Sequence, residues 1–217
     1  MKETGEARMK TKSEELFEKF LADNSMTFEK IKEETTPRPD YLVTVGTAQV
    51  IFEVKELAED ENFDVIKDPA YPHIKSHSRT LGDHVRHKIN ASKKQIQYRA
   101  KQGIPSVLLI YNNLDLVFQM FGTEQMDFIA AMYGAPSIRL NTQTGAASEM
   151  FNGKDQMLQP QKNTSFSAVG HICDRGGTIT VTLFENVFAK AKIPFDQLPP
   201  CFEVPKIEVS TAPMALP

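Results

Sequence analysis

Two short runs of β-branched and aromatic residues, separated by a two-residue break, constrain the fold of this chain more than any other feature. The runs are residues 41–45 and residues 48–54, and Gly46-Thr47 stands between them. Residues of this kind favour strands, and a glycine-containing break between two such runs is typical of a β-hairpin. The sequence therefore predicts two antiparallel strands early in the chain.

The second of these runs carries charged residues that a half-buried strand does not need. Because successive side chains of a strand point to opposite faces, Glu53 and Lys55 share one face, whereas Phe52 and Val54 occupy the other. Asp40 directly precedes the first strand, so the hairpin brings it to the same end as Glu53 and Lys55. Two carboxylates and a lysine in this arrangement suit a hard divalent cation and a phosphate, because Mg²⁺ prefers oxygen ligands.

The Pro-Asp … Glu-Val-Lys pattern between residues 39 and 55 resembles the signature of the PD-(D/E)xK nuclease superfamily. The resemblance covers residues 13–111 and implies a stand-alone bacterial-type phosphodiesterase that cuts DNA and depends on Mg²⁺ or Mn²⁺. By the same resemblance, Asp40, Glu53 and the Val54 carbonyl bind the metal ion. Lys55 then acts on the attacking water or on the charge of the transition state.

Residues 13–21 have the apolar spacing of an amphipathic helix, and Ser13 is its expected N-cap. Members of the superfamily commonly carry a glutamate on such a first helix, near the metal ion. The resemblance assigns this role to Glu14, and it leaves Glu15 and Glu18 as alternatives.

The segment that follows the hairpin predicts a second helix and another strand. Residues 84–102 have helical spacing, and residues 106–111 are a continuous apolar run typical of a buried strand. With a short strand at residues 27–31, this gives the order of elements that the superfamily uses in its core. The resemblance places Gln95 of the second helix at the site, with Gln97 as the neighbouring choice.

Positive charge is concentrated in one segment, although the formal net charge of the chain is −3. Residues 73–101 contain eight lysines and arginines against one acid, Asp83. Because contacts with phosphates supply most sequence-independent affinity for nucleic acid, this segment predicts a DNA-binding surface beside the carboxylates. The candidate contacts are Lys75, Arg79, Arg86, Lys88, Lys93 and Lys94.

The remaining segments show weaker patterns. Residues 58–82 contain acids and prolines with little periodicity, which predicts a flexible flap over the cleft. Residues 166–173 and 178–184 flank an Asp-Arg-Gly-Gly turn and predict a hairpin that either extends the core sheet or forms an added layer. The expected division is a nuclease-like core at 1–135, a β-rich extension of the same domain at 136–205, and a flexible tail at 206–217.

The expected fold is α/β: a restriction-endonuclease-like core with a central mixed β-sheet flanked by helices, plus a C-terminal β-hairpin addition. No apolar run is long enough to span a bilayer, and residues 1–6 lack the apolar core of a signal peptide, which predicts a cytoplasmic protein. Two cysteines, Cys173 and Cys201, favour reduced thiols over a disulfide framework.

The sequence leaves a second function open, a non-catalytic nucleic-acid-binding or assembly subunit that keeps the nuclease fold. The choice between DNA and RNA, and between endonuclease and exonuclease, also stays open. Restriction-like enzymes often cut both strands as homodimers, so the resemblance allows a homodimer.

Overall fold

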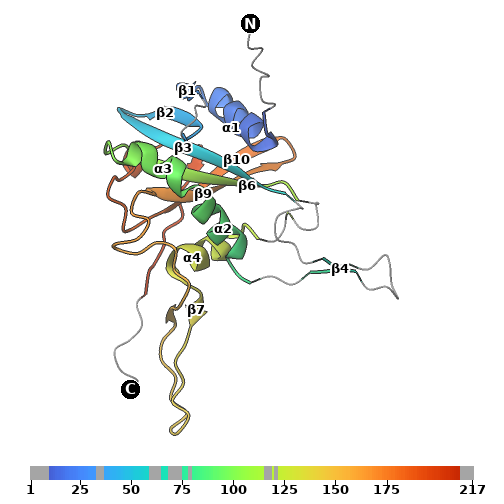
Figure 1. Ribbon diagram of the computed structural model, residues 1–217, viewed down its shortest axis with the longest axis vertical. Helices are drawn as coiled ribbons and strands as arrows, with labels where there is room; N and C mark the ends of the chain where they lie inside the picture. Colours follow the sequence, from blue (N-terminus) through green and yellow to red (C-terminus); the bar gives the residue numbers. More distant parts are fainter. Residues whose placement is uncertain are drawn as a thin grey trace, which may run out of the picture.

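The structure is a computed structural model of the 217-residue chain. It describes residues 10–32, 37–58, 65–67, 75–77, 80–114, 119 and 122–210, with the backbone alone at 65–67 and 75–77. Within this described part, the centre is a seven-stranded sheet with the order β1-β2-β3-β6-β9-β10-β11 (Figure 1). The chain is therefore an α/β protein with a central mixed sheet.

The sheet combines an antiparallel half with a parallel centre. Its strands are β1 (Phe28–Lys30), β2 (Tyr41–Val45), β3 (Ala48–Leu57), β6 (Ser106–Asn112), β9 (Ala168–Arg175), β10 (Thr178–Glu185) and β11 (Phe202–Glu203). Strands β1, β2 and β3 are antiparallel, whereas β3, β6 and β9 are parallel. Strand β10 returns antiparallel to β9 and lies parallel to β11. The predicted strands are confirmed, and the C-terminal hairpin extends the core sheet rather than forming a separate layer.

Helix α1 (Lys12–Asp23) covers one face of the sheet, as its apolar stripe predicts. The expected N-cap at Ser13 is wrong, because the helix begins two residues earlier. The Thr11 side chain accepts a hydrogen bond from the Glu14 N–H, and the Glu14 carboxylate accepts one from the Thr11 N–H. This reciprocal capping box satisfies two backbone donors at once, which a cap at Ser13 does not achieve.

The expectation of one helix over residues 84–102 is also wrong. The structure has two helices, α2 (Asp83–Ala91) and α3 (Lys93–Ala100), with a break at the fully buried Ser92. The backbone of Ser92 lies at φ −89° and ψ 0°, in the sparsely allowed bridge region. Ile89 and Ile96, on either side of the break, bury their side chains in one apolar cluster.

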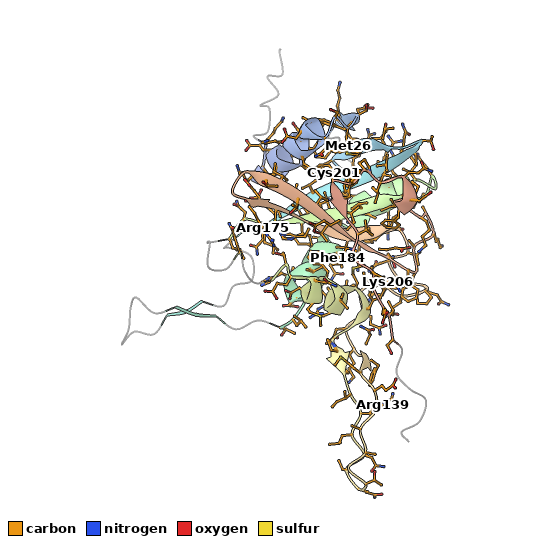
Figure 2. The ribbon with its side chains drawn as sticks, turned by 180° about the vertical axis from the view of Figure 1, so that it is seen from behind. Met26, Arg139, Arg175, Phe184, Cys201 and Lys206 are labelled. Carbon is orange, nitrogen blue, oxygen red and sulfur yellow. The ribbon has the colours of Figure 1, made fainter. Side chains whose placement is uncertain are left out.

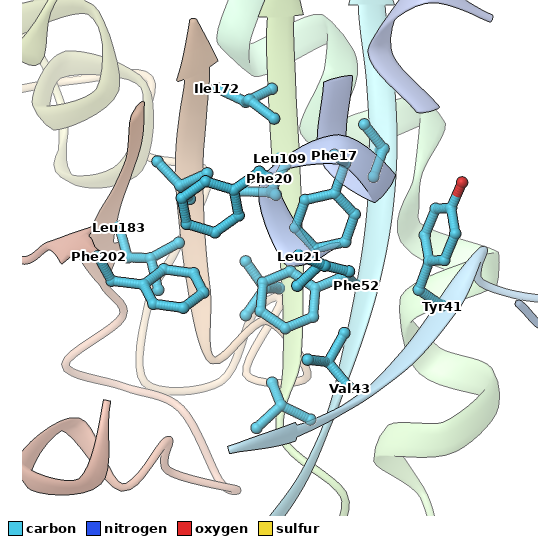
Figure 3. Packing of buried hydrophobic residues seen from close by; sticks show 14 of the residues in the cluster. Phe17, Phe20, Leu21, Tyr41, Val43, Phe52, Leu109, Ile172, Leu183 and Phe202 are labelled. Atoms are coloured by element: carbon cyan, nitrogen blue, oxygen red, sulfur yellow. The ribbon is translucent and has the colours of Figure 1, made fainter. Parts of the chain in front are cut away.

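An aromatic cluster holds α1 against the sheet (Figure 3). The ring centroids of Phe17 and Phe52 are 5.0 Å apart, and those of Phe20 and Phe202 are 5.2 Å apart. Full burial of a phenylalanine stabilises a fold by about 1.5–3 kcal/mol. Phe202 lies on β11, so a strand near the end of the chain completes the core built around α1.

A second cluster lies on the opposite face, under α2, α3 and α4 (Gln125–Tyr133). The rings of Phe128 and Phe184 stack with their centroids 4.6 Å apart, which joins α4 to β10. The buried Asp127 carboxylate accepts a hydrogen bond of 2.8 Å from the Gly82 N–H, immediately before α2. Helices α2 and α4 are thus fixed to each other and to the sheet.

Two hairpins extend from this body (Figure 1). Strands β4 (Val65–Lys67) and β5 (Lys75–His77) pair within the predicted flap, and the rest of residues 59–79 lies outside the described residues. Strands β7 (Pro136–Ser137) and β8 (Phe151–Asn152) begin an arm that points away from the sheet.

Two further expectations concern the chain as a whole. None of the helices in the described segments is long and apolar enough to cross a membrane. Cys173 and Cys201 are free thiols, as the sequence predicts.

Candidate active site

The β2–β3 hairpin fixes the position of Asp40. The register pairs Tyr41 with Phe52, so Asp40 lies beyond the end of β2 and next to the middle of β3. Oδ2 of Asp40 accepts a hydrogen bond of 2.8 Å from the Val54 N–H. The Asp40 carbonyl accepts another of 2.8 Å from the Ile31 N–H, which secures the residue on its other side.

Glu53 and Lys55 lie together on β3, as the alternation of side chains predicts. The Lys55 ammonium lies 2.5 Å from Oε1 of Glu53, whose side chain is only 1% exposed. Neither oxygen of the Glu53 carboxylate has a hydrogen-bond partner in the part of the chain that the structure describes. Lys55 and the Asp40 backbone nevertheless interact with this carboxylate, and both lower the pKa of Glu53.

The electrostatics of the site favour a proton or a cation on Glu53. Burial and the neighbouring charge of Asp40 raise the pKa of Glu53 to about 8, although the charge of Lys55 acts in the opposite direction. Burial also raises the pKa of Asp40, against the Val54 N–H and Lys55, which lower it. A buried carboxylate and a half-buried one beside each other resist simultaneous ionisation unless positive charge is supplied.

The residues present fit a Mg²⁺ or Mn²⁺ ion. The buried oxygens of Glu53 have no hydrogen bond to lose, and the adjacent Asp40 supplies a second carboxylate. In the described segments there is no group of three or more His, Cys, Asp and Glu side chains that could hold a metal. A metal ion would therefore rest on Asp40, Glu53 and the Val54 carbonyl, with water and substrate oxygens as further ligands, which is common for Mg²⁺.

Glu14 lies close to this pair but is engaged elsewhere. Its carboxylate accepts hydrogen bonds from the Thr11 N–H at 2.8 Å and from the Lys30 ammonium at 2.9 Å. Burial raises the pKa of Glu14, but these two partners outweigh burial and lower it overall. The charge of Glu14 contributes to raising the pKa of Asp40, which couples α1 electrostatically to the site.

The other two glutamates of α1 have different surroundings. Glu15 is exposed, and Glu18 accepts a hydrogen bond of 2.9 Å from the Tyr41 hydroxyl. The sequence does not predict Lys30 as the partner of Glu14. Its position on the predicted short strand at residues 27–31, beside β2, is a signal that could have indicated it.

The structure does not join Gln95 to the carboxylates. Gln95 is half-buried on α3, which packs on β3 and β6, and its side chain forms no hydrogen bond with described residues. Gln97, the alternative, is exposed. Gln95 is thus on the helix next to the candidate site, without a contact that assigns it a role.

The residues of the predicted basic surface differ in exposure and in their contacts. The Arg86 guanidinium donates to the Leu81 carbonyl at 2.6 Å and the Ala130 carbonyl at 3.3 Å, so Arg86 braces α2 against α4. Lys88 is buried, Lys93 is half-buried and Lys94 is exposed. The side chain of Lys75 and all of Arg79 lie outside the described residues.

Comparison of the chain with family models, with curated proteins and with solved structures finds no match. Function is therefore inferred from the geometry and the electrostatics of Asp40, Glu53 and Lys55. These three residues converge as the spacing of the sequence predicts.

Proposed function

We propose that the protein is a metal-dependent phosphodiesterase that cleaves DNA with Asp40, Glu53 and Lys55. The observation that carries the proposal is the Glu53 carboxylate, which is buried beside Asp40 and has no hydrogen bond from the described residues. Lys55 supplies one positive charge for two neighbouring carboxylates, so negative charge is left over when Asp40 and Glu53 are both ionised. A divalent cation held by the two carboxylates would compensate that charge, and a nuclease site uses such a cation.

Asp40, Glu53 and the Val54 carbonyl would hold the Mg²⁺ or Mn²⁺ ion. When bound, the ion neutralises charge on the scissile phosphate and lowers the pKa of a water molecule. The Val54 N–H keeps the Asp40 carboxylate directed at β3. Glu14, held by Thr11 and Lys30, adds negative charge near Asp40 without being free to turn toward a ligand.

Lys55 carries the positive charge closest to Glu53, and we assign it to the reacting phosphate. It orients the attacking water and stabilises the negative charge that develops in the transition state. The water oxygen forms a bond to phosphorus, and the bond from phosphorus to the leaving sugar oxygen breaks. One proton passes from the attacking water to the solvent, and one proton from the solvent reaches the leaving oxygen.

The arrangement of elements supports a restriction-endonuclease-like core. Helix α1, the β2–β3 hairpin and β6 follow the order that the superfamily uses, and the three site residues lie at the hairpin. Gln95 on α3, together with the exposed Lys94, extends the proposed substrate contacts to that helix.

A cleavage assay with matched variants tests the proposal. The substrates are linear, nicked, single-stranded and branched DNA, with RNA beside them, in Mg²⁺, in Mn²⁺ and in chelator. We expect cleavage that needs the metal and falls at least about 100-fold in Asp40→Asn and Lys55→Ala. Glu15→Gln, which changes an exposed acid of α1, should keep full activity.

Two results would overturn the assignment. Cleavage that persists in both Asp40→Asn and Lys55→Ala excludes these residues as the active site. Metal-independent binding of nucleic acid without cleavage of any substrate indicates the non-catalytic subunit instead.

A further inference from the structure

One tyrosine ring of α3 holds two guanidinium groups. The guanidinium of Arg38 lies over the ring of Tyr98, with its central carbon 5.3 Å from the ring centroid. The guanidinium of Arg99 approaches the same ring, at 5.8 Å from the centroid. Contacts of this kind stabilise a cation against an aromatic face. Tyr98 therefore brings together two cations from separate parts of the chain, the segment before β2 and helix α3.

The chain places Arg38 next to the candidate active site. Arg38 stands two residues before Asp40, a separation that an extended chain spans in about 7 Å. Because Arg38 precedes Pro39, an extended backbone is favoured at this position. In an extended segment, residues two apart point to the same side, which is the side of the Asp40 carboxylate.

The packing of α3 leads to the same side of the sheet. Val54 faces the aromatic cluster under α1, so Glu53 and Lys55, its neighbours on β3, project to the opposite face. Helix α3 packs on β3 and β6 from that opposite face, where Ile96 belongs to the second apolar cluster (Figure 1). The ring that holds the two guanidinium groups is thus on the helix that covers the face of the site.

Positive charge prevails along α3. Residues 84–114 contain no aspartate or glutamate, and α3 itself carries three cations, Lys93, Lys94 and Arg99. The acids that Arg38 meets on its own segment and on β3 are Asp40 and Glu53, which the proposed metal ion engages. A phosphate that reaches α3 beside the site therefore meets cations.

The two guanidinium groups are held in place and are partly open to solvent. Arg38, Tyr98 and Arg99 are all half-buried. A guanidinium has five N–H donors, and of the described residues only Gln102 accepts a hydrogen bond from Arg99, at 3.2 Å. A guanidinium that is already positioned can bind a phosphate with two parallel hydrogen bonds and loses little freedom in doing so.

We propose that Arg38 and Arg99, positioned by Tyr98, each bind a backbone phosphate of the nucleic-acid substrate beside the cleaved bond. The inference rests on the proposed function, because the cleaved bond is taken to lie at Asp40, Glu53 and Lys55. Contacts with phosphates fix the position of a strand and read no base. The pair therefore orients the substrate without selecting its sequence.

The salt dependence of binding tests the two contacts. Fluorescently labelled duplex DNA of about 20 base pairs is titrated with the protein between about 50 mM and about 200 mM KCl, with Ca²⁺ in place of Mg²⁺ to prevent turnover. Each phosphate contact contributes about 0.9 to the slope of log affinity against log salt concentration. We expect Arg38→Ala and Arg99→Ala each to lower that slope by about this amount, and to lose about tenfold in affinity at the lowest salt.

Three further variants separate a phosphate contact from structural support. Arg38→Lys keeps the charge but loses the planar fork, so the slope should stay while the affinity falls several-fold. Tyr98→Phe keeps the ring and should bind as the wild type does. Arg139→Ala, on the projecting arm (Figure 2), should also leave the slope unchanged. If Arg38→Ala does not fold, Arg38→Lys and Arg99→Ala carry the test.

The binding slope and the cleavage assay fail separately. An unchanged slope in both alanine variants overturns the two contacts even where the wild type cleaves DNA. A slope lowered in both variants, without cleavage of any substrate, supports the contacts and removes the phosphodiesterase. A wild type that binds no nucleic acid overturns both proposals.

Discussion

The Lys55 ammonium lies 2.5 Å from Oε1 of Glu53, two residues earlier on the same strand. This contact places a positive charge against a carboxylate that the fold has almost entirely removed from water. Lys55 alone does not bring the pKa of Glu53 back to its ordinary value of 4.5, because burial and Asp40 still raise it to about 8. The folded protein without metal therefore favours a protonated Glu53.

The stability of the metal-free protein should depend on pH through Glu53. A carboxyl whose pKa is raised on folding stabilises the fold below its unfolded value of 4.5, and this contribution disappears as the pH rises through about 8. We expect the free energy of unfolding of the wild type to fall by a few kcal/mol, relative to Glu53→Gln, between about pH 5 and about pH 8. Urea unfolding in the presence of a chelator measures this difference.

Glu15→Gln is the matched control, because it removes an exposed glutamate of α1. Its stability should follow that of the wild type at every pH. A constant difference between the wild type and Glu53→Gln over the same range would show that Glu53 does not titrate as proposed.

Mg²⁺ should stabilise the wild type and not the variants that lack a ligand. A metal ion at about 100 times its dissociation constant adds about 2.7 kcal/mol to the free energy of unfolding. For a chain of this size that corresponds to a Tm increase of about 5–10 °C. Thermal unfolding with and without Mg²⁺ should show the increase in the wild type and in Glu15→Gln, and should show it reduced or absent in Asp40→Asn. An undiminished increase in Asp40→Asn argues against a metal site at this carboxylate.

Glu14→Gln should lower the stability of the protein but leave its binding of Mg²⁺ largely unchanged. The substitution removes the ion pair with Lys30, whose side chain is 40% exposed, and weakens the capping box with Thr11. We expect a loss of about 1 kcal/mol in urea unfolding, mainly from the cap. The Tm increase on adding Mg²⁺ should remain, because the Glu14 carboxylate is occupied by Thr11 and Lys30. A loss of that increase as large as in Asp40→Asn would identify Glu14 as a ligand.

Local patterns predict the part of the site that one hairpin builds. The alternation of side chains along β3 places Glu53 and Lys55 on one face, and Gly46-Thr47 sets the pairing that brings Asp40 to Val54. The sequence also contains the pattern of the α1 capping box, because Glu14 follows Thr11 by three residues.

Long-range packing decides the features that the sequence does not show. Helical spacing continues through Ser92, because Ile89 and Ile96 are seven residues apart and would share one face of an unbroken helix, so the sequence pattern does not show the break. The contact of Arg38 with Tyr98 needs the segment before β2 and helix α3 to come together, and no single segment carries its pattern. Arg86 likewise lies in a basic segment but reaches backbone carbonyls on α4 and before α2.

The turn between β2 and β3 offers a test of the hairpin itself. Gly46 has φ +57°, and an added Cβ would collide with the side chain of Gln197, whose Oε1 accepts hydrogen bonds of 3.2 Å from the Thr47 N–H and hydroxyl. Gly145, at φ +73° on the projecting arm, has nothing within 4 Å of such a Cβ. We expect Gly145→Ala to cost about 1–2 kcal/mol from backbone strain.

Gly46→Ala should cost about 1–2 kcal/mol more than Gly145→Ala, because Gln197 must move and its hydrogen bonds with Thr47 are lost. Urea unfolding of the two variants gives the difference directly. In the Gln197→Gly background the colliding atoms, including Cβ of residue 197, are absent, so Gly46→Ala should then cost no more than Gly145→Ala. Equal costs of the two glycine substitutions in the unmodified chain would show that Gln197 does not hold the turn. In that case the position of Asp40 would depend on the strand pairing and on its hydrogen bonds with Val54 and Ile31.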